Sequence, residues 1–417
     1  MLKQIQGSQG VAQAIALCRP EVICAYPISP QTHIVEALGA LTGSGKLEDC
    51  EFINVESEFA AMSVAIGSSV AGARSYTATA SQGLLFMAEA VYNASGLGLP
   101  IVMTVASRSI GAPINIWNDH SDSLSQRDSG WLQIFAEDNQ EAVDMHIQAF
   151  KIAEELSIPI MVCMDGFVLT HAYERMDIPT QEQVDAYLPP YDPRQKLDVN
   201  HPVSIGAMVG PEAFTEVRYL FHHHTIEALQ AIEKASEDFE KAFGRKSGGL
   251  LSPYKIEGAD TIVLALGSVI GTIKDTIDEM EKEGKKVGLI GIKSYRPFPD
   301  KQLAELLKGA KKVVVIDRAL QVGIGGVVTD DVIRATRKMD LDIFSVIAGL
   351  GGRPITKKGL KDVFNKAMNG ELEELYFLDL DKEVVEKQLK REKEDRHTGP
   401  LAEAVVRDSV SIHKGGI

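Results

Sequence analysis

Short apolar runs alternate with longer amphipathic stretches along the first half of the chain, and this alternation predicts a β-sheet covered by helices. Runs rich in β-branched and other apolar residues lie at 21–26, 52–55, 74–80, 101–107 and 158–165. Helix-like stretches separate them, and the longest covers 139–157, with Asn139 as its expected N-cap. Nearly continuous apolar strands joined by helices indicate a parallel sheet that is buried on both faces.

A second series of strands and helices follows a break in this pattern. Residues 174–224 lack periodicity, so we expect a long ordered crossover on the surface. An amphipathic helix is expected over 226–244, and KSGGL at 246–250 is a natural linker. Beyond the linker, a small doubly wound domain is predicted by the apolar runs at 261–267, 286–292, 312–317 and 343–349.

These patterns divide the chain into three parts. We predict an α/β domain with a long crossover over 1–245, a smaller α/β domain over 255–365, and a charged C-terminal tail over 366–417. Within the tail, VVEKQLKREKED predicts a helix that either wraps a partner or packs loosely.

Net charge and hydropathy then exclude several classes of partner. The 417 residues carry a formal net charge of −15, which disfavours binding to nucleic acid phosphates. No apolar run is long enough to span a bilayer, so we expect no membrane segment. The N-terminal MLKQIQGSQG has no apolar stretch typical of a signal peptide, and a cytoplasmic location is therefore expected.

Cysteine and histidine spacing gives no sign of a metal or iron–sulfur centre in this chain. The cysteines, Cys18, Cys24, Cys50 and Cys163, form no C-x-x-C pair, and no four-cysteine cluster motif is present. We interpret them as small hydrophobic residues of a reducing compartment. The triplet at 222–224 consists of histidines, for which a surface role is favoured over metal binding.

Glu58 is the first candidate for chemistry. In a helix over 58–71 it would share a face with Met62, Ile66 and Ser69, and a carboxylate among such neighbours is costly to bury without a partner. One interpretation is an acid placed favourably near a helix N-terminus. The other is a carboxyl group that shares a proton with a bound ring nitrogen. The pattern alone supports both equally.

Loops that follow predicted strands hold the other candidates, because such loops build the ligand site of an open α/β sheet. In CAYPISPQT, prolines 27 and 30 would hold Ser29 and Thr32 rigidly, as ligands or as helix caps. ATASQG at 78–83 offers hydroxyl groups with the same two possible roles.

The stretch 106–131 is long, polar and without periodicity, which is typical of a functional loop. Arg108 directly follows a strand and suits a bidentate clamp on a substrate carboxylate. The alternative role of Arg108 is a structural ion pair with one of the loop aspartates at 119, 122 and 128. We expect that role of Arg127 instead.

Several of these stretches resemble the pyruvate:ferredoxin oxidoreductase family. The matching strings are YPISPQT, VESEFAAMSVAIGSSVAGARSYTATASQG, NIWNDHSDSLSQRDSGW, GPEAFTEVRY, SYRPFP and AGLGGR, and the resemblance runs from about residue 5 to 360. It implies a pyrimidine-binding thiamine diphosphate domain with a parallel sheet, followed by a smaller α/β domain like the C-terminal domain of transketolase.

The resemblance also implies roles for individual residues. Glu58 would hydrogen-bond N1′ of the thiamine aminopyrimidine, and further cofactor contacts are expected from Pro27, Ile28, Thr79 and Ser81. Arg108 and Ser29 would meet the carboxylate or carbonyl of a 2-oxo acid. That acid would lose carbon dioxide, coenzyme A would take the acyl group, and the electrons would leave singly.

Missing motifs then predict partner subunits. No GDG motif is present, and MDGF at 164–167 is only a partial echo of one. A β subunit would therefore hold the diphosphate and its Mg²⁺, so we expect no metal in this chain. Iron–sulfur clusters would belong to partner chains, namely γ and ferredoxin-like δ subunits, and either ferredoxin or an NAD-linked subunit would receive the electrons.

The sequence leaves alternatives open for the substrate and for the class of protein. NIWNDH favours pyruvate, but Ser29 replaces a threonine of many family members and could widen the pocket for a branched or aromatic 2-oxo acid such as phenylglyoxylate, with NAD as final acceptor. A non-catalytic scaffold subunit is a further alternative, which the intact Glu58 and Arg108 argue against. An unrelated α/β protein that binds small acids is another.

Overall fold

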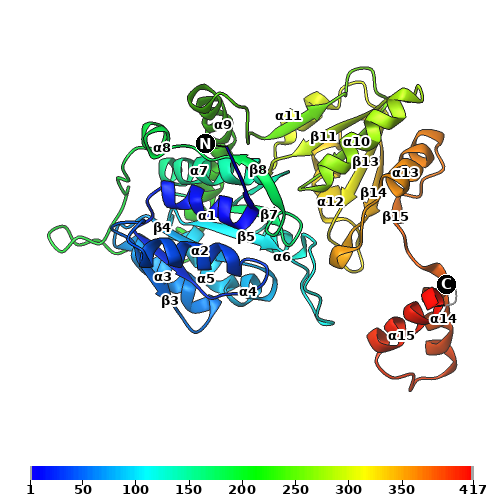
Figure 1. Ribbon diagram of the computed structural model, residues 1–417, viewed down its shortest axis with the longest axis horizontal. Coiled ribbons are helices and arrows are strands. Elements are labelled where there is room, and N and C mark those ends of the chain that lie inside the picture. Colours follow the sequence, from blue (N-terminus) through cyan, green and yellow to red (C-terminus); the bar gives the residue numbers. More distant parts are fainter. Residues whose placement is uncertain (1, 415–417) are drawn as a thin grey trace.

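The computed structural model describes residues 2–414 and shows two sheets, each covered by helices, with a helical hairpin standing apart from both (Figure 1). The first sheet has the order β12-β6-β7-β5-β4-β2-β3. Its parallel strands are β2 (Val22–Ala25), β3 (Glu51–Asn54), β4 (Ser75–Thr79), β5 (Val102–Ser107), β6 (Leu132–Phe135) and β7 (Ile160–Asp165). The predicted strands of this region are therefore confirmed, and β6 is an addition to them.

Both faces of this sheet are buried, as the continuous apolar strands predicted. One face packs against α1 (Gly7–Leu17), α2 (Thr32–Gly43) and α7 (Asn139–Leu156), and the other against α3 (Glu58–Val70), α4 (Ser81–Phe86) and α5 (Ala88–Gly96). Strand β7 shows the alternation: Ile160 and Val162 belong to the first core, and Met161 and Cys163 to the second.

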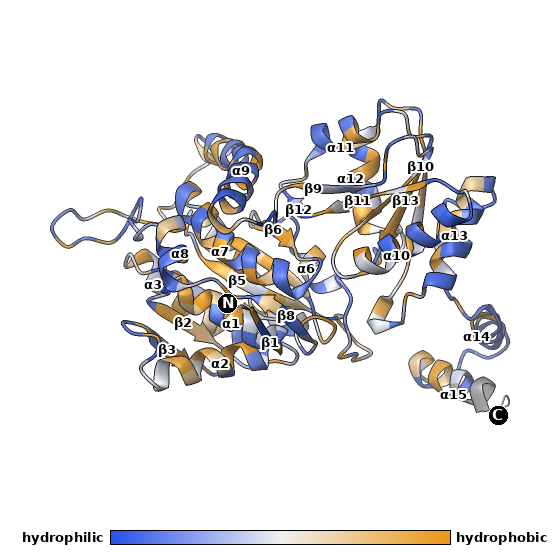
Figure 2. Ribbon diagram, turned by 45° about the horizontal axis from the view of Figure 1, so that its top comes forward, coloured by the Kyte–Doolittle hydropathy of each residue, from blue (hydrophilic) through white to orange (hydrophobic). Residues whose placement is uncertain are grey.

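The second sheet has the order β15-β14-β13-β10-β11-β9, and all its neighbours are parallel except β9 (Leu251–Tyr254). The remaining strands are β10 (Thr261–Ala265), β11 (Val287–Ile292), β13 (Lys312–Asp317), β14 (Asp342–Ile347) and β15 (Leu375–Phe377). Helices α10 (Val269–Lys282) and α13 (Lys357–Asn369) cover one face, and α11 (Asp300–Leu306) and α12 (Val327–Thr336) the other. Figure 2 shows apolar strands between helices whose outer faces are polar.

One strand crosses from the second half of the chain into the first sheet. β12 (Ser294–Arg296) pairs antiparallel with β6 and forms the edge of that sheet. Apolar residues of both halves also share one buried cluster, which joins Met103 and Val105 of β5 to Leu264 and Val313 of the second sheet. The two halves are thus packed together through a common core.

Three local predictions are wrong. Residues 174–224 are not one irregular crossover, because they contain most of β8 (Tyr173–Asp177), which pairs antiparallel with β1 (Leu2–Gln6), and all of α8 (Gln181–Tyr187). The helix predicted to begin at 226 is α9 (Phe214–Phe243), which begins earlier and contains the histidine triplet. The N-cap of α7 is Asp138, whose side chain accepts the N–H of Glu141 at 2.8 Å, and not Asn139.

The last part of the tail forms a helical hairpin of α14 (Lys382–Glu394) and α15 (Leu401–Lys414), in agreement with the helix predicted there, whereas β15 at its start belongs to the second sheet. In Figures 1 and 2 this hairpin lies away from both sheets. Among the described helices, none has the length and apolar composition needed to cross a bilayer.

Candidate active site at the strand ends

The residues singled out in the sequence meet where strands of the first sheet end. Glu58 is the first residue of α3, and the Ser57 side chain caps this helix by accepting the N–H of Ala60 at 3.2 Å. Although it is a carboxylate, Glu58 is only 7% exposed. In the described part of the chain no hydrogen bond or ion pair reaches its carboxylate, so this largely buried side chain faces the site without a protein partner.

Gly83 makes room for this carboxylate. A Cβ at Gly83 would lie 2.6 Å from Glu58 Oε1 and 2.6 Å from Thr79 Oγ1, closer than real contacts allow. Thr79 Oγ1 is itself buried and has no hydrogen-bond partner among the described residues. A carboxylate and a hydroxyl group therefore face the same glycine, and both remain available to a ligand with a polar edge.

Arg108 lies at the end of β5 and reaches back to the loop after β2. Its Nη1 donates to the Ser29 carbonyl oxygen at 2.8 Å, and its Nε donates to the Asn115 carbonyl oxygen at 3.3 Å. Burial lowers the pKa of this guanidinium, an effect that Asp122 opposes. Within the described chain no carboxylate pairs with Arg108, which agrees with a role toward an external anion rather than a structural ion pair.

The other predicted residues occupy different settings. Ser29 and Pro27 are exposed and Ile28 is half-buried, so this loop presents its surface to the site. Ser81 is fully buried, and its hydroxyl oxygen lies 2.5 Å from the Ser109 carbonyl oxygen and 2.5 Å from Gln82 Oε1. The hydroxyl group beside Glu58 is therefore that of Thr79, while that of Ser81 is engaged inside the protein.

Arg127 does not form the ion pair that was expected of it. It donates to the Leu124 carbonyl oxygen at 3.2 Å, and no carboxylate of the described residues lies within ion-pair distance. The aspartate at 122 is turned instead toward backbone N–H groups, so the charge pairing suggested by the loop composition does not occur there.

Two residues that the sequence analysis did not single out for a site role connect the strand-end loops. Fully buried Gln31 donates from Nε2 to the carbonyl oxygens of Tyr26 at 2.9 Å and Ala78 at 3.0 Å. Asp122 accepts the N–H groups of Ser81 and Arg108. Both residues lie in the quoted strings YPISPQT and NIWNDHSDSLSQRDSGW, but only the fold reveals these contacts.

Asp165 lies at the end of β7, within the MDGF stretch that partly resembles a GDG motif. It belongs to the junction between the two sheets. Its Oδ1 lies 2.7 Å from His120 Nε2, and its Oδ2 accepts the N–H of Ser268 at 3.0 Å and bonds from the Ser268 hydroxyl and the Arg318 guanidinium. Burial alone would raise the pKa of Asp165, but Arg318 and His120 hold it well below its ordinary value.

A loop of the second half also packs on the NIWNDH segment. Gly351 donates its N–H to Asp119 Oδ2 at 2.9 Å and accepts from Asn115 Nδ2 at 3.1 Å. Gly352 has a φ of +81°, and a Cβ there would lie 2.4 Å from Trp117 Cβ. The AGLGGR string is therefore a close-contact loop that supports the segment holding Arg108.

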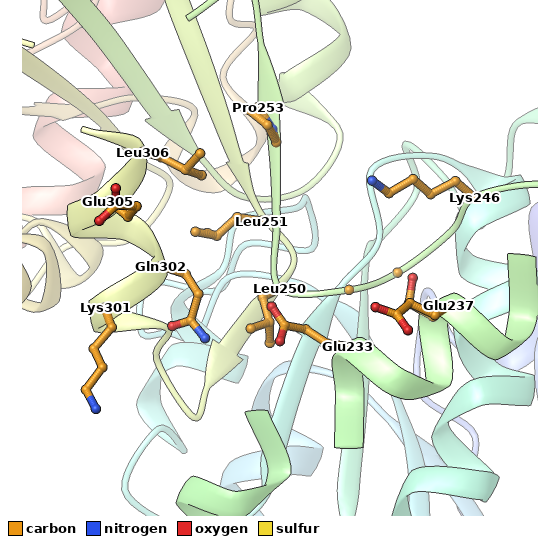
Figure 3. A pocket seen from close by; sticks show the side chains of 13 residues that line it. Glu233, Glu237, Lys246, Leu250, Leu251, Pro253, Lys301, Gln302, Glu305 and Leu306 are labelled. Atoms are coloured by element: carbon orange, nitrogen blue, oxygen red, sulfur yellow. The ribbon is translucent and has the colours of Figure 1, made fainter. Parts of the chain in front are cut away.

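A separate pocket of about 780 Å³ lies between α9 and α11 (Figure 3). Side chains of both charges line it, including Glu233, Glu237, Lys246 and Lys301. None of the strand-end residues contributes to it, so its position does not support a role in the chemistry proposed for Glu58.

Comparison with known proteins agrees with this arrangement. The family model for the thiamine diphosphate-binding domain of pyruvate flavodoxin/ferredoxin oxidoreductase matches residues 13–237, and that for core domain II of pyruvate:ferredoxin oxidoreductase matches 259–360. The chain belongs to the pyruvate:ferredoxin oxidoreductase family. It is a subunit of a 2-oxoacid oxidoreductase, an enzyme built from several subunits.

Among curated relatives, pyruvate synthase subunit PorA of Methanosarcina barkeri is 43% identical over 390 residues, which cover 91% of this chain and 97% of PorA. Among solved structures, 2-oxoglutarate:ferredoxin oxidoreductase from Magnetococcus marinus matches with a TM-score of 0.66 at 19% identity. That match covers 88% of this chain and 65% of the other.

A split-gene transketolase matches with a TM-score of 0.52 at 14% identity, covering 88% of this chain and 99% of the other. These structural likenesses confirm the predicted fold class, a thiamine diphosphate-binding domain followed by a domain like the C-terminal domain of transketolase.

The residues around Glu58 fit one part of the cofactor that the family model names. An aminopyrimidine ring carries nitrogen acceptors and an amino donor, and the Glu58 carboxyl group, by sharing a proton, and the Thr79 hydroxyl can bond to such groups. The described residues contain no cluster of three or more histidine, cysteine, aspartate or glutamate side chains that could hold a metal ion.

Proposed function

We propose that this chain forms the pyrimidine-binding wall of a thiamine diphosphate site in an enzyme that oxidatively decarboxylates pyruvate. Coenzyme A would receive the acyl group and carbon dioxide would be released. The observation that carries this proposal is the buried, unpartnered Glu58 carboxylate beside Gly83 and Thr79. The 43% identity to a pyruvate synthase subunit supports pyruvate as the substrate.

Each residue of the site has a separate task in this proposal. Thiamine diphosphate, when bound, supplies the nucleophilic carbon and accepts the electron pair left by carbon dioxide. Glu58 would hold a proton against ring atom N1′, because a carboxyl group without another partner can share one there. The Thr79 hydroxyl would orient the ring, and the backbone of Pro27 and Ile28 would flank it.

The substrate would lie between Arg108 and Ser29. Arg108 uses Nη1 and Nε on backbone carbonyl groups, and its remaining donors could hold the 2-oxo acid carboxylate by charge-assisted bonds. The exposed Ser29 side chain could donate its hydroxyl hydrogen to the substrate carbonyl oxygen. The same small side chain supports the alternative of a branched or aromatic acid such as phenylglyoxylate, with NAD as acceptor.

Partner chains would complete the enzyme. We propose a β subunit that holds the diphosphate and Mg²⁺, together with γ and ferredoxin-like δ subunits whose iron–sulfur clusters pass electrons to ferredoxin. Within this chain, residues 1–245 would bind the pyrimidine, 255–365 would support the loop around Arg108, and the tail from 366 would contact a partner. A scaffold without catalysis would have no need for an unpartnered buried carboxylate, which disfavours that alternative.

The test is an anaerobic assay of the complex purified through a tag on this chain, supplied with thiamine diphosphate, Mg²⁺, coenzyme A and a viologen acceptor. We expect viologen reduction that depends on coenzyme A and is fastest with pyruvate among pyruvate, phenylglyoxylate, 2-oxoglutarate and branched 2-oxo acids. Preference for another acid would replace pyruvate as the substrate. A complex without thiamine diphosphate and without activity on any acid would contradict the proposal.

A further inference from the structure

Three hydrogen-bonding ties join the loops of the candidate site into a closed ring. Gln31 joins the loop after β2 to the end of β4, through Tyr26 and Ala78. Arg108 joins the loop after β5 to the loop after β2, through the Ser29 carbonyl oxygen. The third tie, between the loops after β4 and β5, is made by Asp122, beside the bond from the Ser81 hydroxyl to the Ser109 carbonyl oxygen.

Asp122 makes its tie through one oxygen atom. Its Oδ2 accepts the N–H of Ser81 at 2.8 Å and the N–H of Arg108 at 2.9 Å, and its Oδ1 accepts the N–H of Ser123 at 2.6 Å. Because both loops bond to the same atom, neither can move without stretching a bond to the other. Ser81 begins α4, which brings Gly83 against Glu58.

A carboxylate is an expensive choice for this position. Asp122 is completely buried, and no cationic side chain of the described residues lies within ion-pair distance of it. Burial raises its pKa to about 7, although the backbone N–H groups of Ser81, Arg108 and Ser123 oppose this rise. A residue needed only for packing would be apolar there, so acceptance of these N–H groups is the property that the site uses.

We propose that Asp122 is a positioning residue, which fixes the Arg108 substrate clamp relative to the Glu58–Thr79 surface that faces the cofactor ring. This inference rests on the proposed function. Asp122 itself touches neither ligand and acts through the backbone of Arg108 and Ser81. Loss of its carboxylate would leave the clamp and the ring surface each intact, with the single bond from Ser81 to Ser109 as the remaining direct tie between their loops.

The first test is a double-mutant cycle in the purified complex. In Asp122→Asn one oxygen acceptor and one amide N–H₂ face the three backbone N–H donors, so the tie is weakened with little change in volume. We expect kcat/KM for the 2-oxo acid to fall about tenfold or more in the wild-type background, mainly through KM. In the Arg108→Ala background, where no clamp remains to be positioned, we expect a further loss of less than about threefold.

Asp128→Asn is the matched control, because Asp128 is an exposed acid of the same loop and we expect no change in kcat/KM. Equal fold-losses of kcat/KM from Asp122→Asn in the two backgrounds would overturn the proposal. A variant that only damages the structure lowers kcat/KM by the same factor whether or not the Arg108 side chain is present. Unchanged kcat/KM in Asp122→Asn would overturn it as well.

The second test does not depend on turnover. Amide hydrogen exchange is measured on the same complexes at Ser81 and Arg108, and we expect it to be at least about tenfold faster in Asp122→Asn and unchanged in Asp128→Asn. Unchanged exchange at both amides would overturn the tie. If the wild-type complex oxidised no 2-oxo acid, the proposed function would fail, and the exchange rates would still decide whether Asp122 holds the two loops.

Discussion

The strand-end site around Glu58 and the domain junction around Asp165 both bury a carboxylate, but they treat it in opposite ways. Asp165 receives bonds from His120, Ser268 and Arg318, and its pKa is held well below the ordinary value. Glu58 receives none from the described residues, and the missing side chain at Gly83 gives its carboxylate room. A carboxylate bonded at both oxygen atoms holds the protein together, whereas one left unpartnered by the fold is available to a ligand.

Glu58→Gln gives the largest expected effect, because it removes the acid and keeps the shape. We expect turnover of the 2-oxo acid to fall by about 10²–10⁴-fold, the usual contribution of a positioned proton donor. The measurement is kcat of the purified complex. Glu56→Gln changes an exposed acid two residues away and should leave kcat unchanged. Near-normal turnover in Glu58→Gln would remove Glu58 from the chemistry and end the contrast with Asp165.

Arg318→Met tests the other side of the comparison. Removal of the guanidinium leaves Asp165 buried without its cation, so we expect the free energy of unfolding to fall by about 3–5 kcal/mol in denaturant titrations. Arg334→Met is the control, because Arg334 and its partner Asp300 are 49% and 38% exposed and such a pair contributes only about 0–1 kcal/mol. Equal losses of unfolding free energy in the two variants would show that the buried ion pair at the junction contributes no more stability than the exposed pair.

Gly83→Ala should disturb the surface that faces the ligand, because the new side chain must displace Glu58 and Thr79. The new Cβ would crowd Glu58 and Thr79, and overpacking of about 1–3 kcal/mol corresponds to a roughly 5- to 150-fold weaker binding of thiamine diphosphate. Gly67→Ala in α3 meets nothing within 4 Å and serves as the control. Calorimetric titration of the complex with thiamine diphosphate measures both. Unaltered affinity in Gly83→Ala would show that the ring binds elsewhere.

The smallest effect concerns a buried base whose hydrogen bonds are all internal. His146 bonds to Thr104 and to the Ala142 carbonyl oxygen, and burial lowers its pKa from 6.5 to about 4. The unfolded chain therefore binds the extra proton between pH 6.5 and 4, and stability falls as the pH falls through this window. From pH 7 to 5.5 we expect the free energy of unfolding to decrease by about 1 kcal/mol through this group.

Denaturant titrations at several pH values measure that slope. His146→Gln should remove this part of the pH dependence, whereas His201→Gln, in an exposed loop, should retain it. If the free energy of unfolding depended on pH in the same way in wild type and His146→Gln, His146 would not be the source of this loss of stability.

The sequence predicted what depends on local pattern. Long apolar strands such as β5 and β7 were evident because both faces of each strand are buried, and α3 was evident from its apolar positions. β1 and β8 were missed because each is polar, exposed on one side and defined only by pairing with the other. β12 was missed because it is three residues long and pairs with a strand far away in the chain.

The site was predicted in the same uneven way. Glu58, Arg108 and Ser29 were found because motifs carry them, and the structure places Arg108 against the backbone of Ser29. The engagement of the Ser81 hydroxyl with Ser109, and the ties made by Gln31 and Asp122, depend on which loops meet in space. No spacing along the chain encodes those meetings, so only the folded arrangement reveals them.

The placement of β12 has a consequence for how the protein is made. As the chain leaves the ribosome, β6 is complete long before residues 294–296 emerge, so the edge of the first sheet waits with unpaired backbone groups. Open edges of this kind pair readily with other chains. A fragment that ends at the linker near residue 250 should therefore aggregate, and the two halves should become soluble only when they are synthesised as one chain.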